Sequence, residues 1–138
     1  MDVYEAIRTR RSVRAYRDKP VPQEILTRIL DAARMAPSGG NRQARQFVVV
    51  TDIKTRKKLA EAANNQHFVG EAPVVIAAVG LDPDRVMSCG IPADQVDVAI
   101  AVDHITLAAV EEGLGPAGSE LFPRRKSARF FKSPLPLK

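Results

Sequence analysis

Apolar residues follow helical spacing in some segments of the chain and form short continuous runs in others. Residues 2–9 and 22–36 carry apolar positions at i, i+3 and i+4, so both are predicted to be amphipathic helices. Pro22 suits the first turn of the second helix, and Pro37 ends it. Two glycines make the next residues, 37–41, a predicted loop.

Two compact apolar runs predict buried strands, one over residues 47–50 and one over residues 74–79. Between them, Asp52 is predicted to cap a third helix that ends near Ala63. A last helix is predicted over residues 96–110, and its apolar side chains surround the axis instead of lining one face. Because a domain this small has few other elements to cover such a helix, we predict that it lies at a subunit interface.

Composition changes this picture mainly at the C-terminal end. The 138 residues, 45% of them apolar, suit a single domain with a real core. The net charge is +5, but six of the 21 basic and one of the 16 acidic side chains follow Gly115, which leaves 15 of each sign in residues 1–115. The basic excess therefore belongs to a tail, residues 116–138. Nucleic-acid binding through that tail is the least favoured function.

Cysteine, histidine and hydropathy patterns exclude several classes of site. Cys89 is the only cysteine, so no intramolecular disulfide can form. No apolar run approaches the roughly 20 residues that span a bilayer, and no export signal is present, so we expect a cytoplasmic protein without a membrane partner. His67 and His104 are the only histidines, and no zinc-binding spacing occurs, so no metal site is predicted.

Two polar patches remain as candidate binding sites. The first combines guanidinium groups and a hydroxyl within five residues, a set that matches the geometry of a phosphate group. Its members are Arg10, Arg11, Ser12 and Arg14. The second covers residues 37–43, where glycines let backbone N–H groups approach a ligand, and Asn41 and Gln43 add amides suited to a planar heterocycle. Taken singly, each patch also fits a solvated polar turn.

The order of these motifs resembles the nitroreductase family. A helix, RRSVRAY, DKPVP, an amphipathic helix, APSGGNRQ and the strand FVVV follow one another through residue 50, and EAPVVIAAVG (71–80) and DVAIAVDHITLAAVEEGLG (97–115) extend the match. The resemblance implies an α+β nitroreductase-like fold, with a central mixed or antiparallel sheet flanked by helices, in a flavin-binding domain over residues 1–115 that is incomplete at its C-terminus.

The resemblance also implies a function and a set of site residues. It implies an FMN-dependent enzyme that uses NADH or NADPH to reduce nitroaromatics, quinones or related small-molecule acceptors by a ping-pong mechanism. The first patch would grip the phosphate and ribityl chain of FMN, and Asn65 would contact the isoalloxazine edge. The other protomer of a homodimer would bring the second patch to the same flavin, through Pro37, Ser38, Gly39, Asn41 and Gln43. No catalytic acid or base is implied.

The chain departs from the family pattern in three places. Ala44 and Arg45 replace the proline and the aromatic residue that usually follow the glutamine of the loop, and Phe68 stands where a basic residue is common. The segment after Gly115 has no recognisable family counterpart. The main alternative function is therefore a non-catalytic remnant that folds and dimerises with weak or no flavin binding.

The sequence after Gly115 suggests a change of reading frame. With plausible codons, residues 116–134 translated from the third base of each codon give CWIGAFSQEEIREVLQIP, which looks like the family's missing segment with an amphipathic helix. We therefore predict a frameshift directly after Gly115, which would make residues 116–138 a divergent tail out of frame. The DNA sequence of the gene tests this prediction, because a gene without a family-like continuation in another frame contradicts it.

Overall fold

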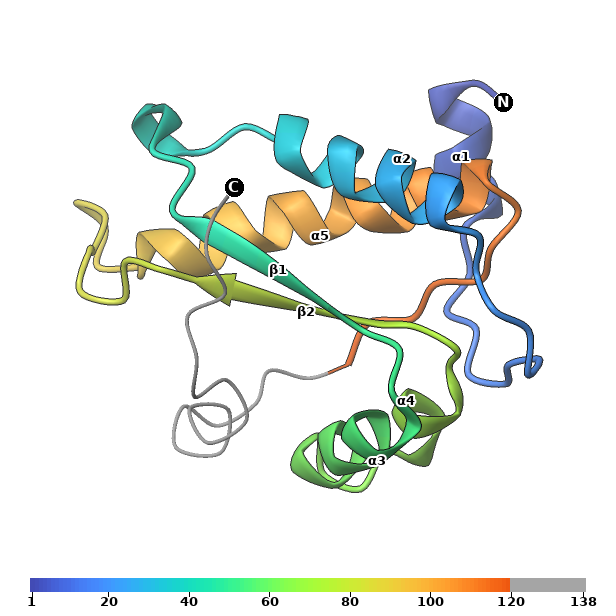
Figure 1. Cartoon of the computed structure of the whole chain (residues 1–138). Helices are drawn as coiled ribbons and strands as arrows, with labels where there is room; N and C mark the ends of the chain where they lie inside the picture. The colour runs from blue at the N-terminus through green and yellow to red at the C-terminus, as the bar shows by residue number, and fades with distance from the viewer. Residues whose placement is uncertain (120–138) are drawn as a thin grey trace.

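The computed structural model describes residues 1–119, in which helices alternate with a small antiparallel sheet (Figure 1). The elements in chain order are α1 (Val3–Thr9), α2 (Gln23–Met35), a 3-10 turn η1 (Gly39–Asn41), β1 (Arg45–Val50), α3 (Ile53–Ala62), α4 (His67–Glu71), β2 (Val75–Gly80) and α5 (Ala93–Glu111). This arrangement confirms the predicted α+β class. Most of the predicted out-of-frame tail, residues 120–138, lies outside the described residues.

The helix ends follow the capping residues. Asp2 Oδ1 accepts a hydrogen bond from the backbone N–H of Glu5 at 2.8 Å and thereby starts α1. Asp52 Oδ2 accepts from the N–H of Thr55 at 2.8 Å, which confirms the predicted cap of α3. The Thr55 hydroxyl, which also donates to Asp52 Oδ2 at 2.7 Å, and then this N–H lower the pKa of Asp52, because both hydrogen bonds favour the charged carboxylate.

The sheet of the described residues consists of β1 and β2, paired antiparallel over their whole lengths. Arg45 lies opposite Gly80 at one end of the sheet, and Val50 lies opposite Val75 at the other. The prediction that both strands are fully buried is wrong for the single chain, because Val49 is 37% exposed and most other strand residues are half-buried. One chain therefore covers the sheet only in part.

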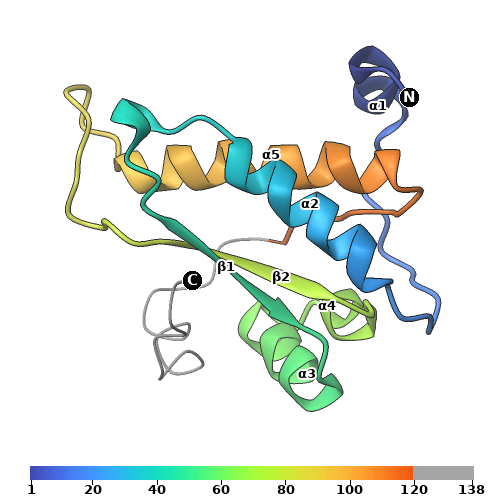
Figure 2. The same ribbon diagram turned by 45° about the horizontal axis from the view of Figure 1, so that its top comes forward.

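Helix α5 is the central element and contacts α1, α2 and both strands. Figures 1 and 2 show α2 running beside α5, with the strands passing along another side of it. Ala33 of α2 and Ala101 of α5 are fully buried, and Nδ1 of His104 lies 3.2 Å from the carbonyl oxygen of Ala32. His104 therefore has the satisfied polar contact that a structural histidine in a helix interface requires.

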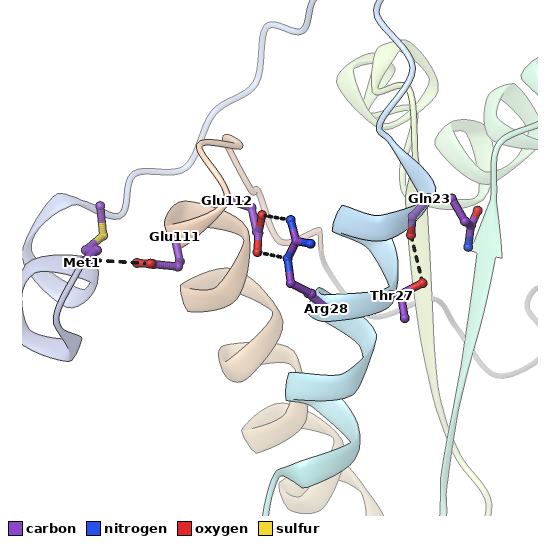
Figure 3. Close-up of polar contacts among 6 residues, drawn as sticks. All are labelled: Met1, Gln23, Thr27, Arg28, Glu111 and Glu112. Carbon is purple, nitrogen blue, oxygen red and sulfur yellow. Dashed lines mark hydrogen bonds and ion pairs between the residues drawn. The ribbon is translucent and has the colours of Figure 1, made fainter.

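Charged contacts hold the C-terminal end of α5 against the two N-terminal helices (Figure 3). Arg28 of α2 donates to Glu112 in a bidentate ion pair, with Nε–Oε1 at 2.5 Å and Nη2–Oε2 at 2.6 Å. The amino group of Met1 lies 3.3 Å from Oε1 of Glu111. Its hydrogen bonds to Arg28 lower the pKa of Glu112, and the same pairing raises the pKa of Arg28.

A second apolar cluster lies where α3 and α4 pack against the sheet. Its buried members are Val50, Leu59, Ala60, Ala63 and Val69, and the half-buried Val48, Phe68 and Val75 pack against them. The short helix α4 was not predicted from the sequence, which indicated only a polar bend before β2. This cluster fixes the turn between α3 and α4, which carries Asn65.

Many large apolar side chains stay exposed or half-buried in the single chain. On α1, Val3 is 68%, Tyr4 76% and Ile7 53% exposed, so only Ala6 of the predicted apolar stripe is buried. Among the large aliphatic side chains of α5, only Val98 is fully buried. Within residues 1–119, no helix is long and apolar enough to cross a membrane.

Candidate functional site

The first candidate patch, called here the arginine segment (residues 10–14), leaves the end of α1 in an extended conformation. Val13 fixes its course, since the N–H of Val13 donates to the carbonyl of Pro116 at 3.0 Å. The Tyr16 hydroxyl donates to the carbonyl of Val13 at 2.5 Å. Burial raises the pKa of Tyr16, although Arg14 opposes the shift, so the hydroxyl remains a protonated donor.

Gly115 allows the chain after α5 to lie against this segment. Gly113, with φ of 74°, turns the chain at the end of α5. A Cβ atom placed on Gly115 would lie 2.6 Å from Cγ2 and 2.8 Å from Cβ of Val13, closer than side chains pack. Only glycine at position 115 therefore permits the observed contact between the two segments.

The side chains of the arginine segment differ in how they are engaged. Those of Arg10 and Ser12 have no hydrogen-bond partner within residues 1–119. Nη1 of Arg11 donates to the carbonyls of Arg8 at 2.7 Å and Arg10 at 2.9 Å, which leaves its other nitrogens available. The guanidinium carbon of Arg14 lies 5.8 Å from the ring centroid of Phe68, a cation–π distance.

Asn65 is exposed and precedes the short helix α4. It lies in the turn between α3 and α4, where Asn64 and Asn65 both adopt left-handed backbone conformations, with φ of 56° and 58°. The next residue, Gln66, accepts a hydrogen bond at 2.5 Å from the hydroxyl of Ser119, in the chain that also contacts Val13. Residues 115–119 thus contact both the arginine segment, through Pro116, and Gln66, the residue that follows Asn65.

The second candidate patch, called here the glycine loop (residues 37–43), connects α2 to β1 and contains η1. Gly40, Asn41 and Gln43 have φ of 61°, 54° and 57°. Non-glycine residues in such conformations cost about 1–3 kcal/mol each and cluster at functional sites. The loop is tied internally, since Ser38 Oγ accepts from the N–H of Gln43 at 3.0 Å and Gln43 Nε2 donates to Asn41 Oδ1 at 3.1 Å.

Charged side chains outside the glycine loop hold its backbone. Arg45 is 8% exposed, and its guanidinium donates to the carbonyls of Arg34 at 3.2 Å, Pro37 at 3.3 Å and also Ala36. Asp97 of α5 accepts from the N–H of Gly39 at 3.0 Å. Sequence reasoning missed this role of Arg45 and Asp97, although an aspartate on an all-round apolar helix is a signal that could have been used.

The two patches lie far apart within one chain. Figures 1 and 2 both show the glycine loop beyond the N-terminal end of α5, whereas the arginine segment lies near its C-terminal end. No hydrogen bond or ion pair within residues 1–119 joins the two patches. Within residues 1–119 of one chain, the two patches are therefore not joined into one site.

The remaining polar residues offer little other chemistry. Cys89 is an exposed free thiol in the loop before α5. No group of three or more histidine, cysteine, aspartate or glutamate side chains in residues 1–119 could hold a metal ion. The candidate patches are thus suited to binding and orientation and contain no acid–base pair.

Comparison with known proteins identifies relatives over most of the chain. The model of the nitroreductase family matches residues 7–66. Proteins provisionally named NADH dehydrogenase/NAD(P)H nitroreductase are 35% identical in Methanothermobacter thermautotrophicus (129 residues; 89% of this chain, 63% of that protein) and 35% identical in Archaeoglobus fulgidus (131 residues; 94% and 73%). The FMN reductase [NAD(P)H] of Bacillus subtilis is 33% identical over 129 residues, which cover 83% of this chain and 52% of the reductase.

Solved structures similar to this chain come from the same family. A nitroreductase family protein from Clostridium novyi NT superposes with a TM-score of 0.87 at 30% identity, over 97% of this chain and 78% of that one. An FMN-dependent nitroreductase from Clostridium difficile R20291 has a TM-score of 0.81 at 26% identity, over 96% and 79%. The chain spans 63% of the length of its Methanothermobacter relative. Sequence and fold agree along both candidate patches, and the chain belongs to the nitroreductase family.

Proposed function

We propose that the chain is a subunit of a homodimeric FMN-dependent oxidoreductase, which takes electrons from NADH or NADPH and passes them to nitroaromatics, quinones or related acceptors. The observation that carries the proposal is the separation of two prepared patches at opposite ends of α5. Two copies related by a twofold axis would bring the arginine segment of each to the glycine loop of the other. Each dimer would then contain two equivalent flavin sites.

The arginine segment fits the phosphate end of FMN. Arg10 and Ser12 present donors that no group of residues 1–119 satisfies, and Arg14 adds a guanidinium above Phe68. Phosphate oxygens accept such charge-assisted hydrogen bonds, often two from one guanidinium. The contact with the Phe68 ring would help to hold the Arg14 guanidinium in place for the phosphate.

The remaining candidate residues fit the planar end. Asn65 presents an exposed amide, and the glycine loop would approach from the partner with Asn41 and backbone N–H groups. These groups would orient the ring and exclude water from one face. When bound, FMN supplies the hydride and electron chemistry, so the protein needs to position two small molecules in turn and to move no proton of its own.

Apolar surface supports the homodimer. Val3, Tyr4 and Ile7 of α1 are more than half exposed, and several aliphatic side chains of α5 are only half-buried. Exposed apolar surface of this extent marks an interface in a soluble protein. A second copy that covers α1 and α5 would complete the burial that the all-round apolar helix requires.

Titration with FMN tests the proposal directly. We expect the full chain to bind FMN, to turn yellow, and to oxidise NADH or NADPH with a nitroaromatic or quinone acceptor. Arg14→Gln should weaken FMN binding about tenfold or more, since a hydrogen bond to a charged group contributes about 1.5–3 kcal/mol. The matched control Arg17→Gln alters an exposed arginine outside the arginine segment and should leave affinity unchanged.

Two other results are distinguishable. A chain that folds but binds no FMN at any accessible concentration contradicts the proposal. Binding of FMN without oxidation of NADH or NADPH indicates instead the non-catalytic form. Pro116 contacts the arginine segment, and Ser119 contacts Gln66 beside Asn65. The binding measurements should therefore use the full chain and not a version truncated after α5.

A further inference from the structure

We infer that Asp97 and Arg85 are positioning residues that hold Gly39, and with it the glycine loop, in the conformation that receives the flavin of the partner subunit. The inference rests on the proposed function and adds two residues outside both candidate patches. Within residues 1–119, the side chains of both residues bond to the backbone of Gly39, so we expect them to act on a ligand through the loop.

Both backbone polar groups of Gly39 form hydrogen bonds with charged side chains. Its N–H donates to Oδ1 of Asp97 at 3.0 Å, and its carbonyl oxygen accepts from Nη1 of Arg85 at 3.3 Å. Hydrogen bonds to charged partners are stronger than those between neutral groups. The position of this residue is therefore fixed from two sides.

Asp97 is built for this contact. Its residue surface is only 5% exposed, and the N–H of Gly39 is its only hydrogen-bond partner within residues 1–119. A buried carboxylate is costly unless it is hydrogen-bonded, so Asp97 favours loop conformations that keep the N–H of Gly39 at this distance. The loop in turn shields the carboxylate.

Arg85 contacts Gly39 through its side chain and the start of α5 through its backbone. Its own carbonyl oxygen accepts from the N–H of Ala93, the first residue of α5, at 3.0 Å. Asp97 lies on the same helix, one turn further on. Both groups that hold Gly39 are therefore fixed to α5.

The glycine loop needs such support because its conformation is unfavourable on its own. Asn41 and Gln43 adopt left-handed conformations, and their side chains bond to each other. A loop that is already ordered loses less entropy when a ligand binds, which raises affinity. Release of Gly39 should therefore weaken flavin binding although neither Asp97 nor Arg85 touches the flavin.

Substitution of Asp97 tests the inference, with Asp103 as the matched control. Asp103 lies on the same helix, is exposed, and has no side-chain hydrogen bond within residues 1–119. We expect Asp97→Ala to weaken FMN binding about tenfold, which corresponds to about 1.4 kcal/mol. Asp97→Asn keeps an acceptor for the N–H of Gly39 and should restore most of the affinity. Asp103→Ala and Asp103→Asn should bind FMN as the wild type does.

Amide hydrogen exchange of the apoprotein separates a specific hold on the loop from a general loss of stability, because only the first would speed exchange in the loop alone. Asp97→Ala should speed exchange in residues 37–43 and leave α2 and α5 protected. Faster exchange throughout the chain, or exchange no faster than in Asp103→Ala, overturns the inference. Unchanged FMN affinity in Asp97→Ala also overturns it.

Arg85→Met keeps the test decisive if Asp97→Ala does not fold. Arg85 is half-exposed, and its loss should weaken FMN binding several-fold, with Arg17→Met as the control. An Arg85→Met protein with wild-type affinity and wild-type loop exchange contradicts the inference. If the wild type binds no FMN but Asp97→Ala still accelerates loop exchange, the proposed function fails while the hold on Gly39 stands.

Discussion

At the scale of single residues, the contact between Gly115 and Val13 gives a sharp prediction. Alanine at position 115 would place its Cβ 2.6 Å from Cγ2 of Val13, and a β-branched side chain has little freedom to rotate away. We expect Gly115→Ala to reduce the free energy of unfolding by about 1–3 kcal/mol, as overpacking does. FMN affinity should fall with it, because Val13 fixes the arginine segment.

Gly118→Ala is the matched control for this prediction. Within residues 1–119, a Cβ atom at Gly118 meets no atom within 4 Å beyond its own chain neighbours, and φ there lies outside the left-handed region. Urea unfolding of the two variants beside the wild type measures the difference. Equal stability of Gly115→Ala and Gly118→Ala would mean that the segment after α5 does not press on Val13.

Single residues also mark the limit of prediction from sequence. The arginine segment and the glycine loop were predicted because their residue types, guanidinium groups and glycines, themselves indicate phosphate binding and close backbone approach. Asp97, Arg85 and Arg45 escaped prediction because their partners are backbone groups, which the sequence does not identify, although the aspartate on an apolar helix was a usable signal for Asp97. In the sequence, Arg45 stands where the family usually has an aromatic residue, which indicated only the loss of an aromatic contact. In the structure, the buried guanidinium of Arg45 donates to carbonyl groups at the C-terminal end of α2.

At the scale of elements, the ion pair between α2 and the end of α5 makes stability depend on pH. Hydrogen bonds from Arg28 lower the pKa of Glu112 below its ordinary value of 4.5. A depressed carboxyl pKa contributes stability that is fully present above 4.5 and is lost as the pH falls through the lowered value. The raised pKa of Arg28 contributes stability that is present over the whole working range and is lost only at strongly alkaline pH, so it adds no pH dependence near neutrality.

We therefore expect Glu112→Gln to lower the urea midpoint at pH 7 and to have less effect as the pH falls below 4.5. The difference between variant and wild type should vanish once Glu112 is protonated in both states. Glu61→Gln, on the exposed face of α3, should show a small difference at every pH. A Glu112→Gln deficit that persists undiminished at pH 3 would show that packing, not charge, joins the elements.

Elements were predicted well where their periodicity extends over several turns. The amphipathic stripe of α2 and the cap of α3 gave both helices nearly to their ends. Helix α4 was missed because its five residues hold too few positions for a periodic pattern. The apolar runs of β1 and β2 predicted strands correctly but not their exposure, because a sequence does not say whether its own chain or a partner covers a face.

At the scale of the whole molecule, the two candidate patches lie near opposite ends of one long helix, α5. Asp97 of α5 holds the glycine loop at one end, and Gly115 lets the chain after α5 return to the arginine segment at the other. The length of α5 separates the two candidate patches. A helix that is apolar all round can meet a second copy of itself, so the proposed dimer and the proposed shared site have the same structural origin.

Mixing two defective variants tests this shared site. Arg14→Gln impairs only the arginine segment and Asn41→Ala only the glycine loop, so each homodimer should contain two weakened sites. A mixed dimer has one site with both defects and one with neither, because each site takes one patch from each protomer. Refolding an equal mixture should therefore restore wild-type FMN affinity at about a quarter of the sites, since random pairing makes half of the dimers mixed. If both patches served one chain's own flavin, every site would keep one defect, and no tight site would appear in the titration.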